Sequence, residues 1–422
     1  MKISMPMEGK TKTWVHTEET MRRQRERAAI REKAALSSLG IFGQITIGCS
    51  LYLYDHVSTP GYLSILLTLP FLLLIQGTGF MLMRRSDPGK GAILEGVGEI
   101  AGRILAALLA LLCWLDGQLA FYALCAMVSN ILPTVSSFQV ALAIAVIVAF
   151  ALGGQGNQGL ARLSRLIGVL VFLCIFYCVL IALPYGNGGH LFPLLGRGMG
   201  SIFRGAFWMC GCLSGACLPL LMPLENKEAM TENRRLLRKP SLLALLGGCG
   251  IALLSGYLLP FYALARPETM GYRLLLLARI SPSVAGWSLL VCAMLFLMLM
   301  TLGAAVQGGG KLLALSGRRR KIPVSLTAGI LLSYVPCGAL NIQPLEDIFL
   351  QLGFFRPVLL LAVLLILWMS VILKKRKKAP EQPLLSNSLS IQIFTPYLFC
   401  NSSTTFITPA FFCSLFVWTI FF

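Results

Sequence analysis

A single carboxylate, Asp116, stands in the middle of a long apolar stretch that reads LLCWLDGQLAFYAL. It is the only carboxylate that we place well inside a predicted membrane span. An ionised carboxylate is costly to hold in hydrocarbon, so such a residue usually faces a cavity, binds a cation or carries a proton. We therefore expect Asp116 to couple a proton or a cation to the function of the protein. The alternative is a structural hydrogen bond to another helix.

A second stretch, residues 204–226, is apolar and long enough to span a bilayer, but it has helix-breaking residues at its centre. It reads RGAFWMCGCLSGACLPLLMPLEN, with Gly211, Ser214 and Gly215 followed by two prolines. Glycine and proline are tolerated at membrane depth where the freed backbone groups line a cavity or bind a solute. Close helix packing is the alternative, because Gly211 and Gly215 have the four-residue spacing of small-residue contacts.

The stretch LGIFGQITIGCSLYLY near the N-terminus is interrupted in the same way, by glycines that surround Gln44 and Thr46. Helix ends at such breaks attract a carboxylate at the N-terminal end and a cation or an ammonium group at the C-terminal end. Because one break opens each half of the chain, the pattern favours a solute-binding site over packing alone.

The composition of the whole chain is that of a membrane protein. Of its 422 residues, 56% are hydrophobic and 13% are charged, which leaves too little polar surface for a soluble globule. Apolar runs of the length needed to cross about 30 Å of hydrocarbon recur along the sequence. We place ten spans at residues 34–54, 61–83, 103–132, 138–153, 166–184, 201–223, 241–265, 284–306, 322–340 and 355–373.

The distribution of Lys and Arg gives these spans an orientation. With a cytoplasmic N-terminus, the segments that fall inside hold 30 of the 36 Lys and Arg residues. Positive residues resist translocation, so this split predicts ten spans with both flanks inside. The net charge of +19 is then an orientation signal, and we expect no nucleic-acid partner. The exceptions, assigned to outside segments, are Arg197, Arg204, Arg266, Arg273, Arg279 and Arg356.

Ten spans divide into five plus five, as in transporters built from two inverted repeats with discontinuous helices near the midplane. We therefore predict an all-α polytopic membrane protein with broken helices 1 and 6. Residues 1–33 form a basic cytoplasmic arm, and residues 34–378 form a ten-helix, permease-like domain. Residues 379–422 form an atypical C-terminal tail with a short hydrophobic segment.

Residues suited to metal binding or catalysis do not form a recognisable set. The 13 cysteines lie mainly in apolar segments without matched C-x-x-C pairs, so we expect small buried side chains rather than a zinc site. His16, His56 and His190 fall in predicted loops or in the arm, and no Ser/His/Asp or Cys/His set can be assembled. We predict no enzymatic activity, no metal and no cofactor.

Several passages resemble one family of membrane proteins. HLFPLLGRGMGSIFRGAF, before the sixth span, is similar to a P-x-x-x-x-G … I-x-x-G passage of the spore germination permeases. NQGLARLSRLIGVLVFLCIFYCVLIALP resembles the start of their fifth span, and PLLMPLENKEAMTENRRLLRK resembles the exit from their sixth. The ending KKRKK also matches. These permeases are the GerAB-type B subunits of germinant receptors, within the amino acid/polyamine/organocation superfamily, and the resemblance covers about residues 36–378.

The resemblance implies a small-molecule germinant pocket, commonly for an amino acid, between broken helices 1 and 6. It also implies a complex with a membrane A subunit and a lipoprotein C subunit in the inner spore membrane. The longer arm, the acidic loop after the sixth span and the tail depart from the family, and the Gly- and Cys-rich sixth span leaves the solute preference open. Matched by position, the pocket would involve Gly43, Gln44, Thr46, Gly48, Cys210, Gly211, Cys212, Ser214 and Gly215.

Three functions are consistent with these features, and all place the chain in a cell membrane in contact with lipid. The first is a permease-like germinant receptor subunit that binds an amino acid and signals to its partners by a shift in helix arrangement. The second is a secondary amino-acid transporter with Asp116 as its proton or cation site. The third is a structural subunit of a membrane complex that binds no solute.

Overall fold

The computed structural model describes residues 34–57, 60–85, 97–192, 195–214, 230–259, 270–278, 283–316, 324–340 and 343–377, together with isolated positions between residues 20 and 32. Every regular element in these segments is a helix, the form in which backbone groups are satisfied within hydrocarbon. The chain divides into two compact units, Met1–Lys377 and Lys378–Phe422. The second unit and most of the predicted N-terminal arm lie outside the described residues.

The first helix runs over Ala34–His56 without an unwound segment. It contains a π-helical segment, η1 (Cys49–Leu53), and ends in a short turn, α2 (Tyr54–His56). The backbone carbonyl of Ser50, within η1, accepts a hydrogen bond of 3.2 Å from Nη1 of Arg273. The predicted break in this span is therefore a π-helical irregularity, a feature that is rare and frequently found at functional sites.

The next three helices are α3 (Gly61–Leu67), α4 (Leu69–Arg85) and α5 (Glu99–Ile131). α5 begins after Gly98, whose φ of 127° lies in the region that glycine adopts without steric penalty. Glu99 then places an acidic side chain at the positive end of the helix dipole. α5 is buried along most of its second half, so Asp116 lies in the interior of the protein.

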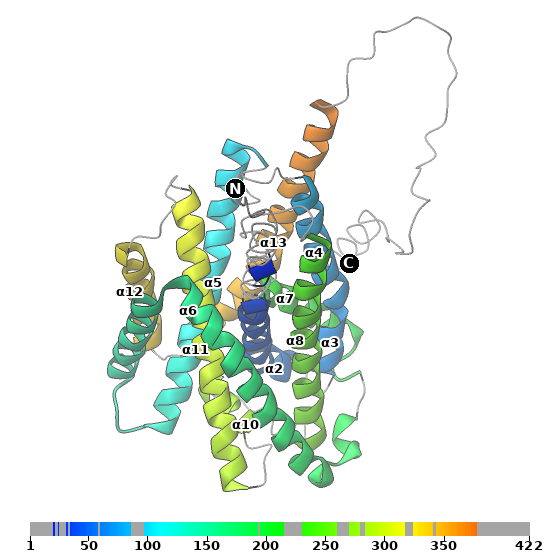
Figure 1. Ribbon diagram of the computed structural model, residues 1–422. Helices are drawn as coiled ribbons and strands as arrows, with labels where there is room; N and C mark the ends of the chain where they lie inside the picture. Colours follow the sequence, from blue (N-terminus) through cyan, green and yellow to red (C-terminus); the bar gives the residue numbers. More distant parts are fainter. Residues whose placement is uncertain are drawn as a thin grey trace, which may run out of the picture. The chain divides into compact units, whose positions relative to one another are not determined.

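The predicted spans at residues 138–153 and 166–184 both fall within one helical element, α6 (Ser137–Ala182), which has 46 residues. At 1.5 Å per residue its axis measures about 69 Å along the bend, which is enough to cross a hydrocarbon core twice, so the number of spans in this region stays a prediction. Figure 1 shows it bent, and its middle carries the glycine-rich sequence LGGQGNQG, a composition that favours bending. Two 3-10 segments follow, η3 (Leu183–Tyr185) and η4 (Gly188–Leu191).

The sixth predicted span is interrupted where its glycines begin. α7 (Met199–Cys210) ends there, and residues 211–214 continue as a 3-10 turn. Two further helices come next, α8 (Met230–Leu258) and the short α10 (Met270–Ala278). α10 occupies a segment that the sequence analysis leaves as an outside loop, and it carries Arg273, which is only 8% exposed.

The last three helices are α11 (Val284–Ser316), α12 (Val324–Leu340) and α13 (Gln343–Lys377). α13 begins well before the predicted tenth span at residues 355–373. The assignment of Arg356 to an outside segment is therefore wrong, because Arg356 lies inside this helix and is 2% exposed.

α5 is the central element of the packing. It packs most extensively against α11, and it also contacts α10, α12 and α13 (Figure 1). α6 covers α11 and α12, whereas α3 lies against α7 and α8. α7 also contacts α13, so the middle of α5 and the end of α7 both face the same helix.

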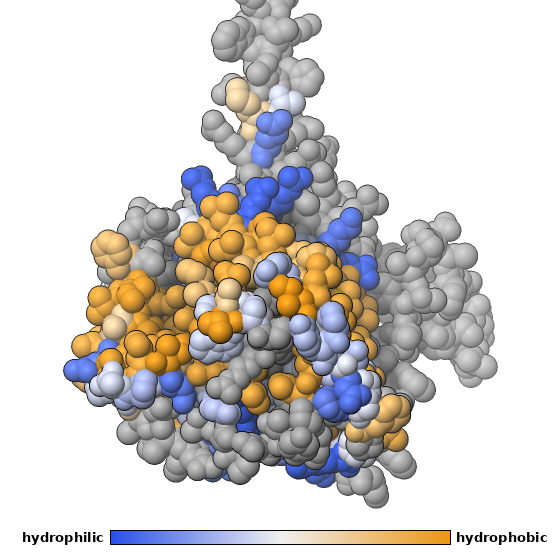
Figure 2. Space-filling view, turned by 90° about the horizontal axis from the view of Figure 1, so that it is seen from below, coloured by the Kyte–Doolittle hydropathy of each residue, from blue (hydrophilic) through white to orange (hydrophobic). Residues whose placement is uncertain are grey.

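Six helices are long and apolar enough to cross a membrane: Ala34–His56, Gly61–Met81, Glu99–Ile131, Arg238–Leu258, Val284–Ser316 and Leu345–Ser370. Large apolar side chains on α6 are exposed, as with Phe150 at 83% and Phe172 at 66%. Apolar residues also form broad patches on the face shown in Figure 2. The chain is a multi-pass helical membrane protein, whereas ten spans and the inverted repeat remain predictions.

Candidate functional site

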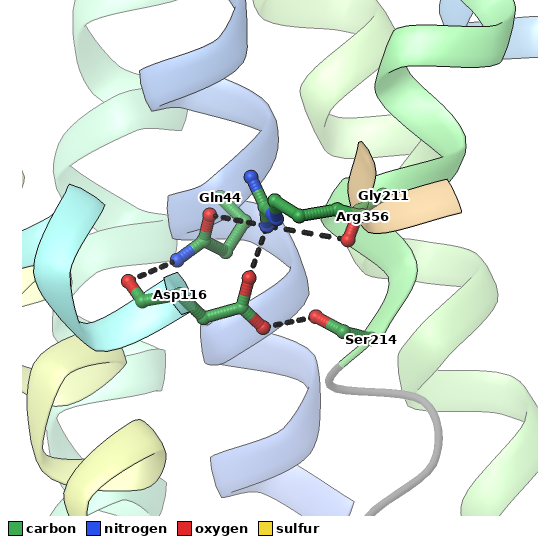
Figure 3. A network of polar contacts seen from close by, with 5 residues as sticks. All are labelled: Gln44, Asp116, Gly211, Ser214 and Arg356. Atoms are coloured by element: carbon green, nitrogen blue, oxygen red, sulfur yellow. Dashed lines mark hydrogen bonds and ion pairs between the residues drawn. The ribbon is translucent and has the colours of Figure 1, made fainter. Parts of the chain in front are cut away.

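Four segments that are far apart in the sequence meet around the side chain of Asp116 (Figure 3). Asp116 comes from the middle of α5, Gln44 from the first helix and Arg356 from α13. Gly211 and Ser214 come from the turn that follows α7. The four side chains of this network are buried, with exposed fractions between 2% and 6%.

Arg356 joins these segments through one nitrogen of its guanidinium group. Nη2 donates to a carboxylate oxygen of Asp116, to Oε1 of Gln44 at 3.0 Å and to the backbone carbonyl of Gly211 at 3.2 Å. Arg356 and Asp116 form a buried ion pair. Each charge makes the other tolerable, since a lone charge buried in the interior costs several kcal/mol.

Asp116 is held from two further directions. Its second carboxylate oxygen accepts a hydrogen bond from the hydroxyl of Ser214. Its backbone carbonyl accepts a bond of 2.9 Å from Nε2 of Gln44, whose Oε1 binds Arg356. The amide of Gln44 therefore bridges the backbone of α5 and the guanidinium on α13, which fixes the first helix against both.

Two nitrogens of the Arg356 guanidinium do not take part in the hydrogen bonds of this network. Its Nε and Nη1 are buried and have no hydrogen-bond partner in the part of the chain that the structure describes. Figure 3 shows one guanidinium nitrogen pointing away from Asp116 and Gln44. The thiol of Cys212, a weak acceptor at best, lies close enough to interact with the group. A buried donor left without a partner costs about 1–3 kcal/mol, so these nitrogens mark a place suited to an acceptor.

Gly211 lets the end of α7 approach α13. A Cβ atom at this position would lie 2.9 Å from Cβ of Arg356 and 3.1 Å from Cδ of Pro357, so a larger residue would push the two segments apart. Pro357 has no N–H, so the carbonyl of Gly353 lacks the helical hydrogen bond that it would otherwise accept from residue 357. Backbone acceptors as well as side chains are therefore available at this junction.

Trp208 fills the space beside the network and is fully buried. Its ring stacks on Tyr52 with centroids 5.2 Å apart, and its Nε1 donates to the carbonyl of Leu350 at 3.1 Å. A Cβ atom at Gly48 or at Gly353 would overlap the indole. These two glycines therefore provide room for Trp208, in keeping with the packing alternative for Gly48.

The structure brings together four of the residues that the sequence analysis singles out, namely Gln44, Asp116, Gly211 and Ser214. Cys212 follows Gly211 in the same turn and lies beside Arg356.

The other predicted pocket residues that the structure describes do not join this network. Gly43 faces the side chain of Thr301 on α11, and the hydroxyl of Thr46 donates to the carbonyl of Phe42 at 2.9 Å. Cys210 is buried at the end of α7. Gly215 lies outside the described residues. The role of these positions in a pocket stays a prediction.

The polar residues on either side of Asp116 on α5 bind neighbouring helices instead. Nε1 of Trp114 donates to the hydroxyl of Ser333 at 3.0 Å, and Nε2 of Gln118 donates to the Ser333 carbonyl at 3.3 Å. The hydroxyl of Tyr122 donates to Oε1 of Glu346 at 3.1 Å. These bonds fasten α5 to α12 and α13.

Sequence reasoning missed Arg356 because it lies at the predicted boundary of the tenth span, and it missed Glu346 because it falls in the predicted loop before that span. Glu346 is 8% exposed and falls within the apolar segment Leu345–Ser370, so Asp116 is not the only carboxylate inside a span. The signal for Arg356 is its position in GFFRPVLLLAV, an arginine with apolar turns on both sides. A buried Asp116 also requires a cationic partner, and Arg356 provides it.

The described residues contain no group of three or more His, Cys, Asp and Glu side chains placed to hold a metal ion. Within the network, the carboxylate that a metal would require is already paired with Arg356.

No family model matches the chain, and no curated protein matches its sequence. Solved structures do match. One variant of the manganese transporter of Eremococcus coleocola has a TM-score of 0.51 at 13% identity, covering 82% of this chain and 78% of that chain. A second variant of the same transporter has a TM-score of 0.48 with the same identity and coverage. At this identity the first match speaks for the fold alone, and the chain has the transporter-like membrane fold of that protein.

Proposed function

We propose that this protein binds a small polar solute at the network of Asp116 and Arg356, and that the solute changes how the helices meeting there are arranged. The observation that carries the proposal is a buried, charged network built at helix irregularities. These irregularities are η1 in the first helix, the turn of residues 211–214 and Pro357 in α13. Ionisable residues inside membrane helices usually mark a substrate or ion pathway.

A purely structural role accounts poorly for this site. A buried ion pair adds little stability compared with apolar residues of the same volume, because both charges must be desolvated. Arg356 also keeps two donor nitrogens without partners among the described residues, a further penalty in a site that only holds helices together. A solute with an acceptor group would relieve that penalty.

The solute that we propose is an amino acid, transported across the membrane as in secondary transporters. The transporter-like fold and the presence of both charge signs in the network support this choice. The manganese of the structural neighbour fits this network less well. A divalent cation would compete with the guanidinium of Arg356 for Asp116 and would be repelled by it.

A second candidate is a germinant receptor subunit that senses an amino acid without moving it. The passages in residues 190–207 and 219–239 that are similar to spore germination permeases favour this candidate. The solute would then shift the population of helix arrangements, and the A and C subunits would respond to that shift. Location in the inner spore membrane belongs to this candidate only.

The test is thermal unfolding of the purified full chain with a panel of amino acids, sugars and nucleosides. A bound solute at 100 times its Kd should stabilise the folded state by about 2.7 kcal/mol. Gln44→Ala and Ser214→Ala should raise the concentration that gives this stabilisation, with normal protein levels. Ser370→Ala is the matched control, because its hydroxyl donates to the carbonyl of Leu367 in the same helix and is not part of the network.

Each outcome separates the candidates. Uptake of the stabilising amino acid into vesicles would favour the transporter, whereas binding without uptake, together with copurified A and C subunits, would favour the receptor. Wild-type affinity in both Gln44→Ala and Ser214→Ala would show that the site lies elsewhere. No stabilisation by any compound would leave the structural subunit as the remaining candidate.

A further inference from the structure

We infer that the Arg356–Asp116 ion pair is exchanged for the two charged ends of a zwitterionic solute. The carboxylate of an α-amino acid would bind Arg356, and its ammonium group would bind Asp116. This inference rests on the proposed function and adds the recognition chemistry, together with a binding role for Arg356 that the sequence analysis did not assign.

The N–H donors of Arg356 that have no acceptor in the described part of the chain support binding of the solute carboxylate. A guanidinium group has five N–H donors in a fixed plane and no acceptor. Here Nη2 serves three acceptors, while Nε and Nη1 have none among the described residues. A carboxylate oxygen is the acceptor that guanidinium binds most strongly, so an incoming carboxylate can bind before the bond to Asp116 is released.

The two carboxylate oxygens of Asp116 support binding of the solute ammonium group. One oxygen binds Arg356 and the other binds the hydroxyl of Ser214. An ammonium group donates three hydrogen bonds, so it can replace the guanidinium at the first oxygen without disturbing the backbone bond from Gln44. Ser214 lies in the 3-10 turn after α7, so this substitution changes the surroundings of an irregular segment.

Charge balance selects the solute. The resident pair is neutral, so a zwitterion adds no net charge to the buried site, whereas a simple carboxylate adds a buried negative charge. A metal ion or an amine without a carboxylate adds a positive one. An uncompensated buried charge costs several kcal/mol, which disfavours all three. Amino acids with uncharged side chains are therefore the predicted class.

The experiment measures thermal stabilisation of the purified full chain by three mixtures. The first contains L-alanine, L-valine, L-leucine, L-serine, L-asparagine and L-glutamine. The second contains the N-acetyl derivatives of these amino acids, which keep the charge of the α-carboxylate only. The third contains their α-carboxamides, which keep the charge of the α-ammonium group only. For the wild type we expect the first mixture to bind at least about 10-fold more tightly than either of the others, since each removed charge loses a charged hydrogen bond.

Substitutions at the pair should invert this preference. Asp116→Asn leaves an unpaired guanidinium, so the N-acetyl mixture should become the best ligand. Arg356→Gln leaves an unpaired carboxylate, so the amides should become the best. The double variant Asp116→Asn/Arg356→Gln carries no charge in the network, and it should lose the preference for free amino acids. It keeps the inference testable if one of the single variants fails to fold.

Two buried residues outside the network provide matched controls. Arg273→Gln removes a second buried arginine, and Glu346→Gln removes a second buried carboxylate. Both variants should rank the three mixtures as the wild type does.

The results distinguish this inference from the proposed function. If the free amino acids stabilise the wild type but the blocked derivatives bind equally well, a solute site exists and the charge exchange is refuted. The exchange is also refuted if the double variant keeps the wild-type ranking. If none of the three mixtures stabilises the wild type, the proposal of an amino acid as solute fails together with this inference.

Discussion

Arg356 and Asp116 hold each other in a place where neither could remain alone. Nη2 of the arginine serves a carboxylate, an amide and a backbone carbonyl, and each of these acceptors comes from a different segment. Loss of either charged partner would leave the other uncompensated, whereas loss of both would leave only neutral groups. The two side chains are therefore expected to be strongly coupled in their effect on stability.

This coupling can be measured with a double-mutant cycle. Asp116→Asn and Arg356→Gln should each lower the free energy of unfolding by about 3–5 kcal/mol, because each leaves a buried charge without a partner. The double variant should be destabilised by clearly less than the sum of the two. Denaturant unfolding in detergent gives the three values. Additive losses would mean that the two charges do not interact in the folded protein.

At the scale of single residues, the sequence identifies one half of the charged pair. Asp116 was predictable because a carboxylate within LLCWLDGQLAFYAL is too costly to bury unless it has a partner or a function. Gln44, Gly211 and Ser214 were predictable because helix-breaking residues surround them. Arg356 was not, because a charged residue followed by proline reads as the start of a span and not as its interior.

The elements that carry the network share a departure from ideal helical geometry. The first helix contains η1, α7 gives way to a 3-10 turn and α13 has proline at position 357. Close contacts then keep these elements in place, as where Ile45 of the first helix packs on Gly248 of α8. A shift of the first helix at Ile45 would move its neighbour Gln44 and disturb the network.

Two glycines on α8 test this contact. A Cβ atom at Gly248 would lie 2.5 Å from Cγ2 of Ile45, whereas a Cβ atom at Gly250 would meet nothing within 4 Å. We expect Gly248→Ala to lower the Tm and to weaken solute binding. Gly250→Ala should leave binding unchanged and raise stability by up to about 1 kcal/mol, from helix propensity alone. Equal effects of the two substitutions would mean that Ile45 adapts to the added methyl group.

At the scale of elements, hydropathy predicts where helices exist better than where they begin and end. The first helix, α5 and α11 lie where the apolar runs predict them. The apolar runs do not predict that α6 continues through residues 154–165 or that α13 begins at Gln343. Charged residues at 162, 165 and 356 divide the apolar runs, whereas the helices continue through them. A helix satisfies its own backbone groups whatever side chains it carries, so composition alone does not show its ends.

The basic residues of the chain predict how the whole molecule is oriented in the membrane. Clusters of Lys and Arg occur in the arm before residue 34, in residues 227–239 and at residues 374–378. Residues 183–192, which include η3 and η4, contain no Lys or Arg, and they lie between two apolar regions. The positive-inside rule predicts that the clusters lie in the cytoplasm and that η4 lies on the opposite side.

Reporter fusions test this orientation. Alkaline phosphatase is active outside the cytoplasm, so a fusion after Phe192 should be active and a fusion after Lys377 should be inactive. Green fluorescent protein, which folds in the cytoplasm, should give the reverse pattern at the same two sites. Active phosphatase at Lys377 would contradict the predicted count of spans.

The separation of Asp116 and Arg356 along the chain also has a consequence for how the protein is made. The two residues are 240 positions apart. At a synthesis rate of about 5–20 residues per second, roughly 12–48 s pass between the translation of Asp116 and that of Arg356. A chain truncated before α13 would retain that uncompensated charge permanently. Only a chain that extends through α13 can form the ion pair, so an incomplete chain differs from it by one uncompensated buried charge.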